Sequence, residues 1–157
     1  MPITQDDLIA ARKAWGDALV AISKAFEDGG IDAARNLASY VLDAAYGYDL
    51  GPVLFKPTLS GGEQTFRATK EGALSYFIAH DERYPNDGGF AIKGWREVRF
   101  EEAANFTEGD VGMWMGWAYF IDKDGNTTKA DKTFGYKKDG DGNVKIVLHH
   151  SSLPYSA

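Results

Sequence analysis

The chain contains no cysteine, which excludes disulfides, thiolate zinc sites and a cysteine nucleophile together. Basic residues are outnumbered, with 17 lysines and arginines against 23 aspartates and glutamates, and they form no cluster. This balance disfavours nucleic acid and anionic membranes as partners. No stretch approaches the roughly 20 apolar residues that a membrane-spanning helix needs, and the first residues lack a secretory pattern. We therefore expect a soluble, cytoplasmic protein.

The first half of the chain carries apolar residues at helical spacing. A chain of 157 residues, 44% of them hydrophobic, can bury a core of its own. No repeat or Pro/Gly/Ser-rich linker divides it, so we expect a single domain over residues 1–157. The pattern predicts three helices: one from a cap at Thr4 to Gly29, a second over residues 32–46 and a third over residues 70–80.

The second half has the alternating pattern of strands, interrupted by turns rich in Asp, Gly and Asn at residues 122–126 and 139–143. A short extended piece, residues 53–56, precedes the third helix. Four longer strands are expected, over residues 90–106, 111–121, 128–137 and 144–152. Helices followed by a meander indicate an α+β domain, with three N-terminal helices packed on one face of a four-stranded antiparallel sheet.

The strand predicted at residues 111–121 is apolar on both of its faces. Met113 and Met115 lie on one face, while Trp114 and Gly116 lie on the other. A strand buried on both sides needs cover on both, and the helices can cover only one. We therefore predict a homodimer that packs through the outer sheet face; the alternative is a loop or the C-terminus folded over it.

Most standard catalytic sites have no signature in this sequence. The glycine turns match neither nucleotide-binding fingerprint, and there is no Gly-x-Ser-x-Gly elbow, although a Ser-His-Asp triad or a carboxylate pair is not excluded. His149 and His150 are neighbours in a predicted strand, where they point to opposite faces, so they cannot chelate one ion together. We expect no metal site built from the three histidines. A carboxylate-rich magnesium or manganese site stays open.

Hydroxyl groups are the remaining candidates for chemistry. Ser151 shares one face of the last predicted strand with His149. Thr58 follows the short extended piece, and Tyr76 lies among apolar residues of the third helix. Taken singly, each has an ordinary structural explanation: a turn threonine, a core tyrosine and an edge-strand serine. Their spacing alone does not decide between these explanations and a site.

Four segments of the chain resemble the iota-class carbonic anhydrases. They are Val-Leu-Phe-Lys-Pro-Thr at residues 53–58, Phe-Arg-Ala-Thr-Lys-Glu-Gly-Ala-Leu-Ser-Tyr-Phe at 66–77, Phe-Gly-Tyr at 134–136 and His-His-Ser-Ser-Leu-Pro-Tyr at 149–155. The resemblance runs in order through nearly the whole chain. It implies the cone-shaped, cystatin-like fold of nuclear transport factor 2, ketosteroid isomerase and the association domain of calmodulin-dependent kinase II, in which the sheet is strongly curved.

The resemblance also implies hydration of carbon dioxide to bicarbonate, which some members of the family carry out with manganese and others without metal. The scarcity of metal ligands in this sequence favours the reaction without a metal or other cofactor. Matching the motifs, we expect Thr58, Tyr76 and Ser151 to bind bicarbonate and to act in catalysis, with His149 beside them as proton acceptor. Ser152 replaces Ser151 in the pocket if a bulge shifts the strand. The alternatives are a manganese-dependent enzyme of the same family, an isomerase or hydrolase acting on a larger apolar ligand, and a non-catalytic ligand-binding or oligomerisation module.

Overall fold

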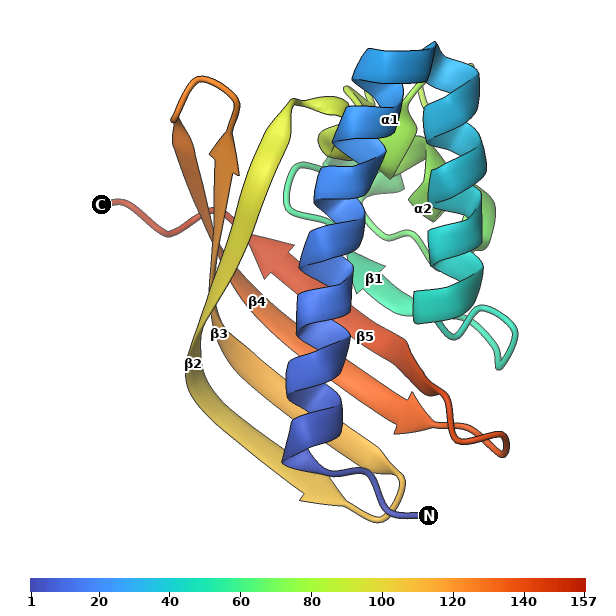
Figure 1. Cartoon of the computed structure of the whole chain (residues 1–157), viewed down its shortest axis with the longest axis vertical. Coiled ribbons are helices and arrows are strands. Elements are labelled where there is room, and N and C mark those ends of the chain that lie inside the picture. The colour runs from blue at the N-terminus through green and yellow to red at the C-terminus, as the bar shows by residue number, and fades with distance from the viewer.

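The structure is a computed structural model that describes residues 1–157. Its helices cover one face of a curved sheet whose strand order is β1-β5-β4-β3-β2 (Figure 1). The elements are α1 (Gln5–Ala45), β1 (Leu54–Lys56), η1 (Gly62–Gln64), α2 (Lys70–Ile78), η2 (Phe90–Ile92), β2 (Trp95–Glu108), β3 (Val111–Asp122), β4 (Thr127–Lys138) and β5 (Val144–Ser152). The predicted α+β class is therefore confirmed, but the number of helices and strands differs from the prediction.

α1 contains both of the first two predicted helices. It begins at a capping box, in which the Thr4 hydroxyl accepts from the Asp7 amide and the Asp7 carboxylate accepts from the Thr4 amide. Gly30, with φ 80° and ψ −168°, interrupts the helix in a region that only glycine enters readily. The chain reverses there, and the second arm of α1 returns beside the first (Figure 1). The structure has two α-helices where three were predicted, because α1 continues across the kink at Gly30 without an intervening loop.

β1 is the fifth strand of the sheet, where the sequence predicted four. It pairs in parallel with β5, so that Phe55 lies opposite His149 and Lys56 lies opposite His150. A three-residue segment is too short to show the alternation that reveals a strand, which is why its partner was not predicted. This parallel pairing places the end of β1 beside the end of β5, and the site is built there.

The sheet bends at a register shift in β2 between Glu102 and Ala104. Gly116 lies opposite Glu102 in β3, and a side chain there would collide with the Glu101 carbonyl oxygen and with the Trp114 ring. Such a bulge increases the local twist of the strand pair. The resulting curvature wraps the sheet around α1 (Figure 1).

The outer face of the sheet carries exposed apolar side chains. Phe106, Met113 and Met115 are 57%, 41% and 54% exposed, and they line one shallow hollow with Ala104. No loop or C-terminal segment covers these side chains, so that alternative is wrong. No helix of the chain has both the length and the apolar character required to cross a membrane.

Candidate active site

Three hydroxyl-bearing side chains from distant segments meet between β1, β5 and α2. Thr58 follows β1 in the chain, and its Oγ1 lies 2.6 Å from the Oγ of Ser151 in β5. The Tyr76 hydroxyl of α2 accepts a 3.2 Å hydrogen bond from the amide of Leu59, the residue after Thr58. All three residues are buried. The structure thus brings together the three hydroxyls that the sequence comparison with the iota class singled out.

Ser151, and not Ser152, faces the interior. Ser151 is fully buried and lies opposite Lys132 of β4, whereas Ser152 is partly exposed. The register shift between β4 and β5 occurs at Gly135, away from the two serines. The side-chain alternation of a regular strand therefore holds at this end of β5.

His149 is fully buried, and both of its ring nitrogens have partners. Nδ1 lies 2.8 Å from the Tyr46 hydroxyl, and Nε2 lies 2.8 Å from Nζ of Lys132. The ring stacks on Phe55 with centroids 4.6 Å apart. Burial first, and then the nearby Lys132, lower the pKa of His149 well below its ordinary value of 6.5. A neutral imidazole with two occupied nitrogens is poorly suited to take a proton directly from water.

Lys132 is an ionisable residue that contacts both His149 and Ser151, and these three side chains form a buried polar cluster. It is 2% exposed, and its Nζ lies 3.1 Å from Ser151 Oγ as well as 2.8 Å from His149 Nε2. Burial lowers the pKa of Lys132 to about 7, with Asp131 opposing the shift and Lys56 adding to it. The cluster therefore holds a lysine that changes charge near neutral pH.

The pocket is closed and mostly aromatic. Its lining residues are Trp15, Phe55, Pro57, Thr58, Tyr76, Phe77, Phe90, Lys132 and His149. Ser151 lies directly behind this wall, bonded to Thr58 and Lys132. The space is too narrow for a sphere the size of a water molecule, so a ligand has to displace side chains slightly.

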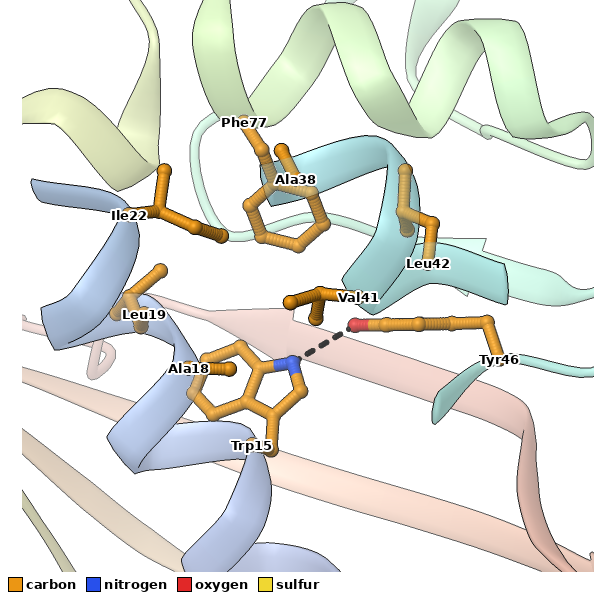
Figure 2. A pocket seen from close by; sticks show the side chains of 9 residues that line it. All are labelled: Trp15, Ala18, Leu19, Ile22, Ala38, Val41, Leu42, Tyr46 and Phe77. Atoms are coloured by element: carbon orange, nitrogen blue, oxygen red, sulfur yellow. Dashed lines mark hydrogen bonds between the residues drawn. The ribbon is translucent and has the colours of Figure 1, made fainter. Parts of the chain in front are cut away.

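An apolar cavity adjoins the pocket between the two arms of α1. Figure 2 shows its wholly hydrophobic lining, in which Trp15 Nε1 donates a 2.9 Å hydrogen bond to the Tyr46 hydroxyl. Trp15 and Phe77 line both spaces. Tyr46 is thus fixed by Trp15 on one side and contacts His149 on the other.

Comparison with known proteins identifies the family. The family described as metal-independent carbonic anhydrase matches residues 6–153. A metal-independent carbonic anhydrase from Nostoc sp. (strain PCC 7120) is 49% identical over 153 residues, which are 98% of this chain and 75% of that protein. The chain belongs to the metal-independent carbonic anhydrase family. The predicted resemblance to the iota class is confirmed.

Solved structures agree with this family and with its fold. The crystal structure of a cyanobacterial iota-carbonic anhydrase complexed with bicarbonate has a TM-score of 0.98 and 48% identity, covering 99% of this chain and 95% of that one. A calcium/calmodulin-dependent protein kinase II association domain from Xanthomonas campestris has a TM-score of 0.61 and 23% identity, covering 96% and 87% of the two chains. The second likeness shows that this carbonic anhydrase has the predicted cone-shaped fold.

The histidines of this carbonic anhydrase do not converge on one point. His80 is exposed, and its Nδ1 lies 2.9 Å from the Ile78 carbonyl oxygen. His150 is also exposed, on the opposite strand face from His149. No group of three or more histidine, aspartate or glutamate side chains is placed to hold a metal ion.

Sequence reasoning missed Lys132 and Tyr46. For Lys132 a signal existed, because Ala130, Phe134 and Tyr136 share its face of the strand, and a lysine in such an apolar row is unusual. Tyr46 had no comparable signal, since a tyrosine at the end of a helix is ordinarily a packing residue. Its role depends on contacts with Trp15 and His149, which only the folded chain brings together.

Proposed function

We propose that the pocket at Thr58, Tyr76 and Ser151 is where this carbonic anhydrase interconverts carbon dioxide and bicarbonate. The proposal is supported chiefly by the relative that is 48% identical, whose structure is a complex with bicarbonate. The hydroxyls of Thr58 and Tyr76 line the aromatic pocket, and the Ser151 hydroxyl is bonded to Thr58, so all three can donate to a small anion there. The same relationship favours metal-free chemistry over the manganese-dependent alternative.

Carbon dioxide is small and uncharged, so aromatic walls can admit it. Attack by water builds negative charge on its oxygens, and hydroxyl donors in a dry pocket stabilise that charge by on the order of 3 kcal/mol each. Burial raises the pKa of Tyr76, which keeps its hydroxyl protonated as a donor. Because that oxygen already accepts from the Leu59 amide, its hydrogen is free to point at the substrate.

Binding of the anion competes with the hydrogen bond between Thr58 and Ser151. In the closed pocket these two hydroxyls satisfy each other at 2.6 Å. Bicarbonate would separate them and accept from both, which would also provide the room that the closed pocket lacks. We propose that His149, with both nitrogens bonded, positions Tyr46 and Lys132 and does not itself accept the proton.

Stopped-flow hydration of carbon dioxide tests this function. The protein would be treated exhaustively with chelator, and the metal content would be measured on the same sample. Full activity without metal is the expected result. Activity that returns only with manganese would keep the family and overturn the metal-free site, and no activity under either condition would favour a binding module.

We also propose that the exposed patch of Phe106, Met113 and Met115 is the interface of a homodimer. Its position on the outer sheet face matches the pairing expected from the two-sided apolar pattern of β3. Analytical ultracentrifugation of the wild type should give a dimer, and Met115→Lys should shift it to monomer. A monomeric wild type would refute the interface.

The cytoplasmic location remains a prediction that cell fractionation would test.

A further inference from the structure

The direction of the hydrogen bonds behind the pocket is fixed at Trp15. Its indole N–H can only donate, and it donates to the Tyr46 hydroxyl oxygen at 2.9 Å. The other partner of that buried hydroxyl is His149 Nδ1, at 2.8 Å. Since Trp15 cannot accept, the Tyr46 hydrogen has to be donated to Nδ1. Burial keeps the His149 ring neutral by lowering its pKa, so its single ring proton lies on Nε2.

The Nε2–H of His149 determines the charge state of Lys132. Nε2 lies 2.8 Å from Lys132 Nζ. A neutral amine has a lone pair that can accept from an N–H, whereas an ammonium has none. An ammonium would force the ring proton onto Nδ1, and the buried Tyr46 hydrogen would then have no acceptor. Lys132 also forms no salt bridge with a carboxylate, so a positive charge there has no counter-charge.

The amine of Lys132 in turn determines which way the Ser151 hydroxyl points. Because His149 occupies the lone pair, the 3.1 Å contact with Ser151 Oγ is an N–H that Lys132 donates. The hydrogen of the fully buried Ser151 then has Thr58 Oγ1, at 2.6 Å, as its acceptor. The Thr58 hydrogen is left for the pocket that this residue lines. We call this series of donated bonds the donor chain; it runs from Trp15 through Tyr46, His149, Lys132 and Ser151 to Thr58.

We propose that Lys132 is a positioning residue, which as a neutral amine orients Ser151 and Thr58 as hydrogen-bond donors towards the substrate. The inference rests on the proposed hydration site and adds what orients its hydroxyls. Before the anion binds, Ser151 donates to Thr58. When the anion separates the pair, Ser151 still accepts from Lys132 and turns its hydrogen to the anion. Both hydroxyls thus offer hydrogens to the negative charge that builds on the oxygens of carbon dioxide.

A neutral amine suits this role better than an ammonium does. Either form can donate to Ser151, but an ammonium would place a full positive charge 3.1 Å from a hydroxyl that holds the product anion. In a poorly solvated site that charge would bind bicarbonate strongly. Tight binding of the product does not accelerate the reaction. The donor chain therefore supplies oriented donors without a charge that retains the product.

Neutron diffraction from a deuterated wild-type crystal tests the direction of the donor chain, because it locates each exchanged hydrogen. Data at about pD 8.5 lie above the pKa of about 7 that burial gives Lys132. We expect deuterium on the Tyr46 oxygen and on His149 Nε2, two deuterium atoms on Lys132 Nζ, and a Ser151 deuterium directed at Thr58. Deuterium on Nδ1, a third deuterium on Nζ, or a Thr58 deuterium directed at Ser151 would overturn the proposal.

Two variants of Lys132 test whether the donor chain affects turnover. Lys132→Met can neither accept nor donate, so the Ser151 oxygen becomes free to accept from Thr58. We expect kcat/KM for bicarbonate to fall about 10-fold, the value of about one hydrogen bond. Lys132→Gln can accept from His149 through its amide oxygen and donate to Ser151 through its amide nitrogen. It should recover most of the loss, although it has no amine.

Lys145→Met is the matched control for these variants. Lys145 is a buried lysine of β5 whose amine donates to the Asp43 carbonyl oxygen, outside the pocket, so its loss should leave kcat/KM unchanged. A wild-type kcat/KM in Lys132→Met, or a Lys132→Gln variant no more active than Lys132→Met, would overturn the positioning role. Wild-type protein without hydration activity would instead overturn the proposed function, whereas the neutron measurement depends neither on activity nor on how the variants fold.

Discussion

The hydroxyl oxygens of Thr58 and Ser151 lie 2.6 Å apart, although 93 positions separate the two residues in the chain. The parallel pairing of β1 with β5 produces this contact, because it aligns the ends of the two strands. These two adjacent hydroxyls can both donate to one small anion once the hydrogen bond between them opens. The pair therefore connects the fold of this chain with its proposed chemistry.

Removing either hydroxyl of this pair should impair turnover. We expect Thr58→Val and Ser151→Ala each to lower kcat about 100-fold, the effect of losing one preorganised donor. The double variant should lose less than the product of the two, because each hydroxyl positions the other. Stopped-flow kinetics measure this, with Ser152→Ala as control since Ser152 points away from the pocket. Wild-type rates in both single variants would remove the pair from the mechanism.

Tyr76→Phe should separate activity from folding. The variant loses the donor to the substrate, so we expect kcat to fall about 100-fold. The Leu59 amide loses its acceptor as well, which should lower the free energy of unfolding by about 1 kcal/mol. Tyr40→Phe, at a tyrosine that is 70% exposed, should change neither quantity. Full activity of Tyr76→Phe would contradict the role of its hydroxyl.

Lys132 should also make stability depend on pH. Its pKa is about 7 in the folded protein and 10.5 without burial, so between these values the unfolded chain binds a proton that the folded chain does not. The free energy of unfolding should therefore rise with pH from 7 towards 10, relative to Lys132→Met. Urea unfolding at pH 7, 8 and 9 measures the difference between the two proteins. A difference that does not change with pH would mean that Lys132 titrates normally.

The buried ion pair of Arg67 and Asp87 should contribute strongly to the stability of the region around α2. Both side chains are buried, their two hydrogen bonds are 2.7 Å long, and the Ser75 hydroxyl also donates to Asp87. Asp87→Ala should cost about 3–5 kcal/mol, because it leaves a buried guanidinium without its counter-charge, although the bonds of Arg67 to the Gln64 and Gly72 carbonyl oxygens remain. Asp17→Ala breaks an exposed pair with Lys13 and should cost less than about 1 kcal/mol. Equal losses in urea unfolding would refute this difference.

Gly30 should resist substitution for a conformational reason. Its φ of 80° with ψ of −168° is costly for any residue with a side chain, although no atom lies within 4 Å of the added Cβ. We expect Gly30→Ala to lower the free energy of unfolding by about 1–3 kcal/mol. Gly61→Ala is the control, since that position is extended and equally open. A neutral Gly30→Ala would show that the kink relaxes without cost.

The fold class and the three hydroxyl residues could be predicted from the sequence. The strand pairing that brings Thr58 and Ser151 together could not. Helical and alternating spacing identified both arms of α1, α2 and the four long strands, because burial on one face repeats with each period. β1 has only three residues, too few to show the alternation of apolar and polar side chains, so its parallel pairing with β5 could not be predicted. Without that pairing, the meeting of Thr58 with Ser151 followed only from the resemblance to a known family.

The contacts of His149 with Tyr46 and Lys132 could not be predicted from the sequence for a different reason. A histidine with an ordinary pKa is a suitable proton acceptor, and this was the role expected for His149. In the fold its two nitrogens meet Tyr46 and Lys132, and burial disfavours its charged form. These contacts join α1, β4 and β5, and no local pattern in the sequence encodes a contact between three elements.

A high-resolution crystal structure of this chain with bicarbonate tests the proposed site most directly. The anion should lie within hydrogen-bond distance of the hydroxyls of Thr58, Tyr76 and Ser151, with the Thr58–Ser151 bond opened and no cation beside it. Bicarbonate bound elsewhere, or a metal ion ligated at this position, would contradict the metal-free hydroxyl site.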